Sequence, residues 1–488
     1  MNFFSSISLI ASALILNGCM TFSENKQTQF LINPPSVDLT IQKSLETQYF
    51  ALSDWPQEDW WNLFESSQLN ALMEEALANN PSILAIQQKM DAANQLALIA
   101  RSKLFPWISF DGADDWEYLS KNGLLRALNP LIPLYAKLYD LKLNLNYELD
   151  IWGKNQEIYK AALGNDLSNQ AESAQVVLLV TTSVAQAYVA IKEYQKQKDL
   201  IGQLIAVQKE IYELQDFLHE KALANKLIVL AAEENYFETE KLQWIVEQQL
   251  EITKHQLNVL VGRSPDTPLC LGEDGLPSIY SLSIPSDITV DLLARRPDLM
   301  AKIWSAKALA HLVNAAITEY YPDINLTAFL GLESVTGRLL FKPSSFTYGF
   351  RPAVHLPIFT AGEIQANIDT QAALFYETIF EYNQLLLSSA QEVSDNLETA
   401  LSFFRQISEQ EKLMERIKER VELTTLLFEK GLGDKLSTYY VKEEFIREEL
   451  EDLNLTYNLY TALVQLIRSL GGGYQSLYVP LRAQEICE

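Results

Sequence analysis

The sequence predicts a mainly α-helical protein in which each chain adds four β-strands to a transmembrane β-barrel. Three observations lead to this fold class. Landmarks in the first half of the chain recur in the second half, very long stretches contain no proline, and four segments alternate apolar with polar side chains. Together they predict an internal two-fold repeat, each half of which combines a strand pair with long, coiled-coil-like helices that form an α-barrel.

The amino terminus indicates export and a lipid anchor. Residues 1–18 carry no charged side chain, and residues 3–16 form a mostly apolar run of signal-peptide length. The run ends at Leu16-Asn17-Gly18-Cys19, which resembles a bacterial lipobox, so Cys19 is the predicted lipidation site. An ordinary signal peptide with an incidental cysteine is the alternative. After Cys19 we expect no membrane-spanning helix, so a membrane crossing would require strands closed into a barrel.

Composition and charge restrict the classes of function that are possible. The formal net charge of −25 argues against a nucleic-acid partner and suits a surface or lumen that favours cations. Only Cys270 and Cys487 remain after Cys19, which excludes a disulfide scaffold and leaves a single bridge open. The four histidines are scattered, and we find no phosphate loop, nucleophile motif or acidic cluster with metal-ligand spacing. We therefore expect neither an enzyme, nor a cofactor, nor a metal site.

Two pairs of matched landmarks define the repeat. Asn80-Pro81 and Arg296-Pro297 each open a helical stretch, and these stretches end at Pro106 and Pro322 with the same offset. Further on, the sequence HEKALANKL at 219–227 reappears as FEKGLGDKL at 428–436. The predicted divisions are a signal peptide (1–18), a lipid-anchored extension (19–60), a first repeat (61–263), an equatorial linker (264–290), a second repeat (291–473) and a tail (474–488).

Each repeat follows the same order of elements. A moderate helix (66–104, then 290–320) leads into a strand pair (106–120 and 138–152, then 323–335 and 345–358). A very long helix follows, since no proline lies between Pro133 and Pro265 or between Pro357 and Pro480. About 65 residues at 1.5 Å each make a rod near 100 Å. The chain then turns at the matched landmarks and returns (227–262 and 436–471).

The strand segments have the length and polarity of membrane strands. Ten or so residues suffice for a tilted strand with one face toward lipid and one toward water. Four strands cannot close around a lumen, so several chains must share the barrel. A half-buried sheet in a soluble domain is the alternative. In the second strand the apolar positions are Leu141, Leu143, Leu145, Tyr147, Leu149 and Ile151, and they alternate with Lys142, Asn144, Asn146, Glu148 and Asp150.

Several short motifs resemble the TolC-type outer-membrane factor family, most closely its lipidated branch that serves resistance-nodulation-division pumps. The resemblance implies a homotrimer with a twelve-stranded barrel and a helical tunnel through the periplasm. Its partners would be a periplasmic membrane-fusion (adaptor) protein, an inner-membrane transporter and outer-membrane lipid, and no bond would be made or broken. The motifs are Trp60-Trp61-Asn62-Leu63-Phe64, Tyr147-Glu148-Leu149-Asp150-Ile151-Trp152-Gly153, Leu293-Ala294-Arg295-Arg296-Pro297-Asp298-Leu299 and Leu470-Gly471-Gly472-Gly473.

The resemblance also places candidate functional residues at the periplasmic tip, where the family closes its tunnel. Members carry aspartates inside the returning helix, whereas this chain has Ser437 and Tyr440 there and its acid, Asp434, lies earlier. We therefore expect a constriction made by Leu436 and Tyr440, with plain interhelical packing as the alternative for Tyr440. We assign the two tip turns to adaptor docking, and ordinary turn chemistry is the alternative. The first turn contains Ala222, Leu223 and Ala224, and the second contains Gly431, Leu432 and Gly433.

The sequence names neither substrate nor pump. Within the channel interpretation, drug efflux, metal efflux and type I protein secretion remain open. A lipid-anchored periplasmic coiled-coil tether is the competing structural interpretation, but it does not explain the amphipathic strands.

Overall fold

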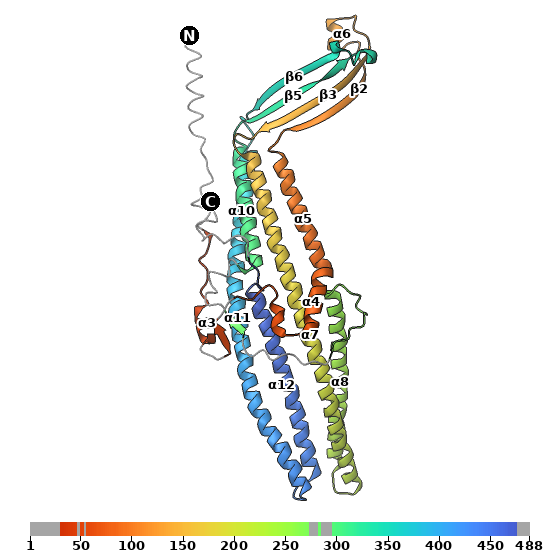
Figure 1. Ribbon diagram of the computed structural model, residues 1–488, viewed down its shortest axis with the longest axis vertical. Helices are drawn as coiled ribbons and strands as arrows, with labels where there is room; N and C mark the ends of the chain where they lie inside the picture. Colours follow the sequence, from red (N-terminus) through yellow and green to blue (C-terminus); the bar gives the residue numbers. More distant parts are fainter. Residues whose placement is uncertain (1–29, 46–48, 53–54, 273–281, 285–294, 476–488) are drawn as a thin grey trace.

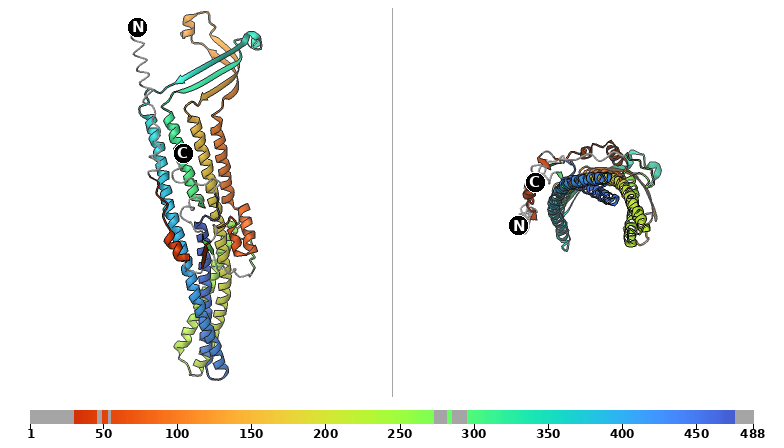
Figure 2. Two further views of the ribbon diagram at one scale, coloured as in Figure 1. Left: turned by 60° about the vertical axis from the view of Figure 1, so that its left-hand side comes forward. Right: turned by 90° about the horizontal axis from the view of Figure 1, so that it is seen from below.

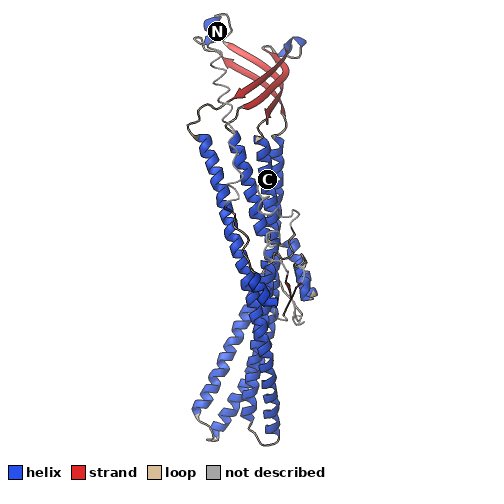
Figure 3. Ribbon diagram, turned by 90° about the vertical axis from the view of Figure 1, so that its left-hand side faces the viewer, coloured by secondary structure: helices blue, strands red, loops and turns tan. Residues whose placement is uncertain are grey.

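The computed structural model describes residues 30–45, 49–52, 55–272, 282–284 and 295–475. The chain is a long rod with a β-sheet at one end and helices along the rest of its length (Figures 1 and 3). The predicted signal peptide, the lipidation site Cys19 and Cys487 lie outside the described residues.

Two halves with the same order of elements make up the rod. The first comprises α4 (Ser67–Asn79), α5 (Pro81–Ser102), β2 (Trp107–Tyr118), α6 (Leu124–Leu128), β3 (Tyr135–Leu149), α7 (Lys154–Glu220) and α8 (Lys226–Leu260). The second comprises α10 (Pro297–Thr318), β5 (Asp323–Ser334), β6 (Phe346–His355), α11 (Glu363–Glu429) and α12 (Lys435–Ser469).

Element lengths confirm the internal repeat. Helices α7 and α11 have 67 residues each, and α8 and α12 have 35 each. Helices α5 and α10 have 22 residues each, and β2 and β5 have 12. At 1.5 Å per residue the two longest helices extend about 100 Å, as their proline-free sequences predict.

The four long strands form one antiparallel sheet in the order β2-β3-β5-β6. Strands β3 and β5 join the two halves in register, with Leu143 opposite Leu330 and Asn144 opposite Phe329. Within the described residues β2 and β6 each have a partner on one side only, so the sheet has two open edges. Each strand overlaps its expected segment, but β3 begins and ends three residues earlier than the expected 138–152, and β6 ends at 355 instead of 358.

The helices lie side by side in a curved layer. Viewed from below, they follow an arc instead of packing around a central core (Figure 2). Helix α7 contacts α5, α8, α10 and α12, and α11 contacts α10 and α12. The largest apolar core lies midway along the rod, where Trp60 and Phe64 pack with residues of α4, α7, α11 and α12.

Two expectations need correction. Helix α7 contains an 18-residue window long and apolar enough to cross a membrane, although we expected no such stretch after the amino terminus. This window is 56% buried within the protein, because it packs among neighbouring helices. The expected helix at 66–104 is two helices, since Asn80 adopts an extended backbone and its side chain caps α5 by accepting hydrogen bonds from the Ser82 and Ile83 amides.

The equatorial region contains a strand pair that the sequence patterns did not reveal. Strand β1 (Phe50–Leu52) pairs in parallel with β4 (Leu282–Ile284), which lies inside the predicted linker. Helix α3 (Asp38–Leu45) packs against α11, where Lys43 forms an ion pair of 2.7 Å with Glu398. Segments far apart in the sequence thus join at mid-height of the rod (Figure 1).

Candidate functional site

The sheet has one apolar face and one polar face. Cross-strand register sets this division, because alternate residues of each strand point to opposite faces. One row of the apolar face runs Phe110, Leu143, Leu330 and Tyr348, and all four side chains are exposed in the single chain. The corresponding rows of the polar face contain Asp111, Lys142, Asn144, Asn146, Thr327, Phe329 and Arg351.

A charged cluster occupies the polar face. The Lys142 ammonium forms ion pairs of 2.7 Å with Asp140 and 2.8 Å with Glu333. It also lies 5.4 Å from the centre of the Phe329 ring, and the Arg351 guanidinium lies at the same distance. The sequence did not single out Phe329 or Arg351, because three separate strands bring this cluster together; cross-strand register is the signal that would have found it.

The two helical hairpins at the far end of the rod turn in the same way. In the first, the Leu223 amide donates to the Leu218 carbonyl; in the second, the Leu432 amide donates to the Leu427 carbonyl. These bonds close each helix end around a residue with positive φ, Ala222 (57°) or Gly431 (70°). Both turns therefore project an exposed leucine, with Leu223 75% and Leu432 77% accessible.

Asp434 caps the returning helix α12. Its carboxylate accepts hydrogen bonds from the Ser437 amide at 2.8 Å and the Ser437 hydroxyl at 2.6 Å. Hydrogen bonds from the Ser437 hydroxyl and amide lower the pKa of the exposed Asp434 carboxyl. In this chain the residues predicted at the constriction, Asp434 and Ser437, thus bind each other at the helix start.

Tyr440 of the predicted constriction and its neighbour Tyr439 lie against α7. The Gln215 amide donates to the Tyr440 hydroxyl at 3.4 Å, and the Tyr439 hydroxyl donates to Glu210 at 2.8 Å. Lys435 lies 3.9 Å from the same Glu210 carboxylate. Leu436 is half-buried and Tyr440 is 46% exposed, so the structure brings these residues to one tip, where α12 meets the end of α7.

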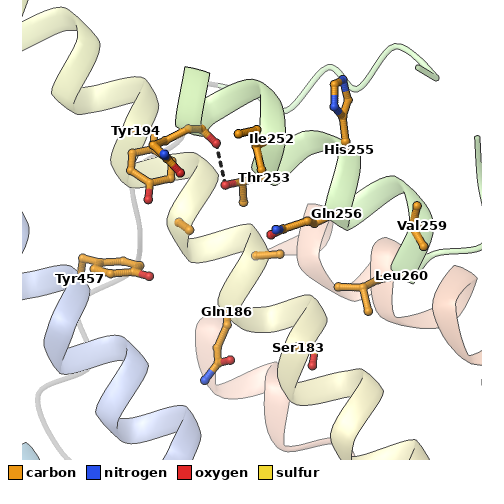
Figure 4. Close-up of a pocket in the computed structure, with 13 residues that line it drawn as sticks. Ser183, Gln186, Tyr194, Ile252, Thr253, His255, Gln256, Val259, Leu260 and Tyr457 are labelled. Atoms are coloured by element: carbon orange, nitrogen blue, oxygen red, sulfur yellow. Dashed lines mark hydrogen bonds between the residues drawn. The ribbon is translucent and has the colours of Figure 1, made fainter. Parts of the chain in front are cut away.

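A hollow of about 710 Å³ lies between α7, α8 and α12 (Figure 4). Tyr194, Tyr457 and Gln186 project around it, and the Thr253 hydroxyl donates to the Gln249 carbonyl. Among the described residues that line this hollow, none is a carboxylate or a cysteine, and His255 is the sole imidazole. Such a lining offers apolar contact and amide hydrogen bonds but no general acid–base pair.

Two sequence motifs meet at mid-height of the rod. Arg296 is buried and binds Asp298 at 2.6 Å, Glu392 at 2.8 Å and the Ser469 carbonyl at 3.3 Å. Gly471 packs against the backbone there, and a Cβ at Gly471 would collide with the Arg295 carbonyl oxygen. Residues 295–299 of the first motif and 470–473 of the second therefore fix the junction between α10, α11 and α12.

An amphipathic sheet with open edges, mounted on helices about 100 Å long, defines one protomer of an outer-membrane channel with a helical duct. The family comparison agrees. The model of the "Outer membrane efflux protein" family matches residues 72–263 and 288–472, which is more than half of the chain. The chain belongs to this family, and it is an outer-membrane efflux channel protein.

Curated relatives extend over nearly the whole chain. "Multidrug resistance outer membrane protein MdtP" of Escherichia coli (strain K12) is 26% identical over 481 residues and covers 96% of both chains. "Multidrug resistance outer membrane protein MdtQ" of Escherichia coli O6:H1 is 27% identical over 486 residues, or 97% of this chain and 99% of the relative.

Solved structures share the fold. The outer-membrane channel OprN has a TM-score of 0.80 at 20% identity and covers 91% of this chain and 97% of its own. The Campylobacter jejuni CmeC outer membrane channel has the same TM-score at 21% identity, with 92% and 95% covered. VceC of Vibrio cholerae has a TM-score of 0.77 at 25% identity, with 86% and 100% covered.

Proposed function

We propose that this protein is the exit duct of a tripartite multidrug efflux system and works as a homotrimer. The observation that carries the proposal is the four-stranded sheet with an open edge on each side. Unpaired strand edges cannot face lipid, because their backbone groups would have no hydrogen-bond partners. Pairing β6 of one protomer with β2 of the next closes three sheets into a twelve-stranded barrel.

In this assembly the polar face of the sheet lines the lumen and the apolar face contacts lipid. The exposed row of Phe110, Leu143, Leu330 and Tyr348 then lies in hydrocarbon. The arc of helices continues the same curvature below the barrel and forms the wall of a periplasmic duct (Figure 2). Substrates pass through passively, handed over by a periplasmic adaptor and an inner-membrane transporter, which we infer to be of the resistance-nodulation-division type.

Cysteine crosslinking tests the assembly. In a background with Cys270 and Cys487 changed to serine, Ser109→Cys on β2 is combined in turn with Thr347→Cys, Arg351→Cys and Ala353→Cys on β6. One combination should give a covalent trimer on a denaturing gel, while Ser109→Cys alone should give none. A purified protein that stays monomeric in detergent and forms no ion-conducting pores in planar bilayers would contradict the proposal.

The tip residues have roles within the same proposal. Leu436 and Tyr440 narrow the duct at its periplasmic end, while Ser437 and Asp434 fix the start of the helix that carries them. Support comes from their common position at the end of the rod and from the contact of Tyr440 with Gln215. Tyr440→Ala should raise single-channel conductance, whereas Tyr236→Ala, on α8, should not. Unchanged conductance in Tyr440→Ala would contradict an aromatic constriction.

The exposed turns are the docking sites for the adaptor in this proposal. Ala222, Leu223 and Ala224 form one turn, and Gly431, Leu432 and Gly433 form the other. A photoreactive crosslinker at Leu432 should capture an adaptor protein in intact cells, and the same crosslinker at Leu131, in the β2–β3 connection at the opposite end of the rod, should not. Capture of an adaptor that belongs to a protein-secretion or metal-export system would redirect the substrate assignment to those alternatives.

A further inference from the structure

Two adjoining hollows lie on the polar face of the sheet, where the strands pass into the helices. The upper hollow has a volume of about 440 Å³ and the lower one about 850 Å³. Trp107, Asn146 and Thr327 line both. In the proposed trimer, on which this inference rests, the hollows open into the base of the barrel lumen.

One cross-strand row forms a trough between two large side chains. Trp107 pairs with Asn146, Asn146 with Thr327, and Thr327 with Arg351. The row therefore begins with an indole and ends with a guanidinium, and the two residues between them are short. Three strand spacings separate the backbones at the two ends by about 14 Å, and both end residues line the upper hollow.

The Trp107 indole is the aromatic surface of the trough that is open to a ligand. The Trp107 side chain is 68% exposed. Phe329, in the upper hollow, lies against Gly349 of the neighbouring strand, where a Cβ would collide with the phenyl ring. Glycine at 349 thus lets the Phe329 ring pack against the backbone of β6.

The charges around the trough favour an anionic group at the Arg351 end. Among the described residues no carboxylate lies within ion-pair distance of Arg351 or of Lys103, which borders the lower hollow. Lys142, by contrast, is engaged by Asp140 and Glu333. Asp111 lines the upper hollow from β2, on the opposite side from Arg351, and accepts hydrogen bonds from Ser109 and Asn144.

Two more groups of the lower hollow suit a ligand with acceptor oxygens. Lys154 lies 3.4 Å from Glu148 and 3.7 Å from Asp323, so its ion pairs are long. The Asn155 side chain is 4% exposed, and its Nδ2 has no hydrogen-bond partner in the described part of the chain. An acceptor at the floor of the hollow would satisfy this donor.

We propose that the trough is a subsite for planar aromatic compounds that carry a carboxylate or sulfonate. The ring stacks on Trp107, and the Arg351 guanidinium binds the anionic group with paired N–H donors. Lys103 adds positive potential below. In the trimer three such subsites surround the lumen, and they hold aromatic anions within an otherwise acidic protein.

Equilibrium dialysis of 2-naphthoate against the detergent-solubilised full-length protein tests the subsite. Arg351→Gln should weaken binding by about tenfold or more, because the loss of one charge-assisted hydrogen bond costs at least about 1.4 kcal/mol. Trp107→Leu should weaken it similarly, and Arg351→Lys should retain part of it. Uncharged 2-naphthol should bind more weakly and be insensitive to Arg351→Gln. Arg338→Gln, in the β5–β6 connection at the far end of the strands, is the matched control.

The same preparations separate this inference from the proposed function. Heat-sensitive trimer bands on gels show that each variant is folded, and bilayer conductance shows that it is a channel. Conducting trimers that bind 2-naphthoate equally with and without Arg351 would overturn the subsite and leave the channel intact. Arg351-dependent binding by a protein that does not conduct would support the subsite and overturn the channel.

Discussion

Glu193 is a buried carboxylate in the middle of α7. Its side chain accepts a hydrogen bond of 2.6 Å from Gln197, and desolvation by burial raises its pKa from 4.5 to about 7. Ionisation therefore costs more in the folded than in the unfolded protein. The cost is absent below about pH 4.5, where the carboxyl is protonated in both states, and it grows as the pH rises toward 7.

Replacing Glu193 by glutamine should therefore stabilise the protein at pH 8 and have little effect at pH 4.5. We expect up to about 3 kcal/mol at the higher pH, visible as a rise in the melting temperature in detergent. The control is Glu213→Gln, also on α7, because the Glu213 side chain is exposed. This change should leave the melting temperature unaltered both at pH 8 and at pH 4.5. If Glu193→Gln lowered the melting temperature equally at pH 8 and at pH 4.5, this account would be contradicted.

Two residue-level assignments could be made from sequence chemistry alone. Asp434 precedes a helix and has a serine three residues later, a pattern typical of an N-cap. Asn80 before Pro81 carries the same kind of signal, and proline at the first helical position strengthens it. Arg351 and Phe329 carry no local signal, because their importance depends on strands from different parts of the chain.

At the scale of elements, the two tip turns form a natural pair for comparison. Both have a residue of positive φ at the same position, but the first half uses Ala222 where the second uses Gly431. A left-handed backbone costs a non-glycine residue about 1 kcal/mol. The first turn is therefore more strained than the second.

Exchanging these two residues should reverse the difference. Ala222→Gly should protect the amides of the first turn against hydrogen exchange, and Gly431→Ala should expose those of the second, each by roughly fivefold for about 1 kcal/mol. Mass spectrometry of peptides from the two turns measures both effects in the assembled protein. Gly202→Ala, inside α7, has open space for its methyl group and should leave both turns unchanged. Faster exchange in Ala222→Gly would be inconsistent with the strain argument.

Element positions were predictable where the chain is periodic and free of proline. The long helices and the four strands follow from local patterns, and their matched lengths follow from the repeat. The parallel pairing of β1 with β4 was not predictable, because each strand has three residues and more than 200 residues separate them. Short strands of this kind gain their stability from neighbouring elements.

At the scale of the whole molecule, the neighbouring residues Leu143 and Asn144 test which face of the sheet meets lipid. Leu143→Arg should reduce the yield of folded trimer in the outer membrane, since a charge near the bilayer midplane costs about 2–4 kcal/mol. Asn144→Arg adds the same side chain to the same strand but on the polar face, and it should be tolerated. Heat-sensitive trimer bands from outer-membrane fractions measure both. Equal loss in the two variants would contradict the assignment of the faces.

The sequence by itself determined the repeat, the long helices, the strands and their two faces, because each depends on spacing between near neighbours. It also showed that four strands are too few to enclose water. The tertiary structure decided the curvature of the helical layer, the strand order that leaves β2 and β6 as open edges, and the row that places Trp107 opposite Arg351. These features depend on register and packing between distant segments, and local patterns do not encode which distant partner each segment meets.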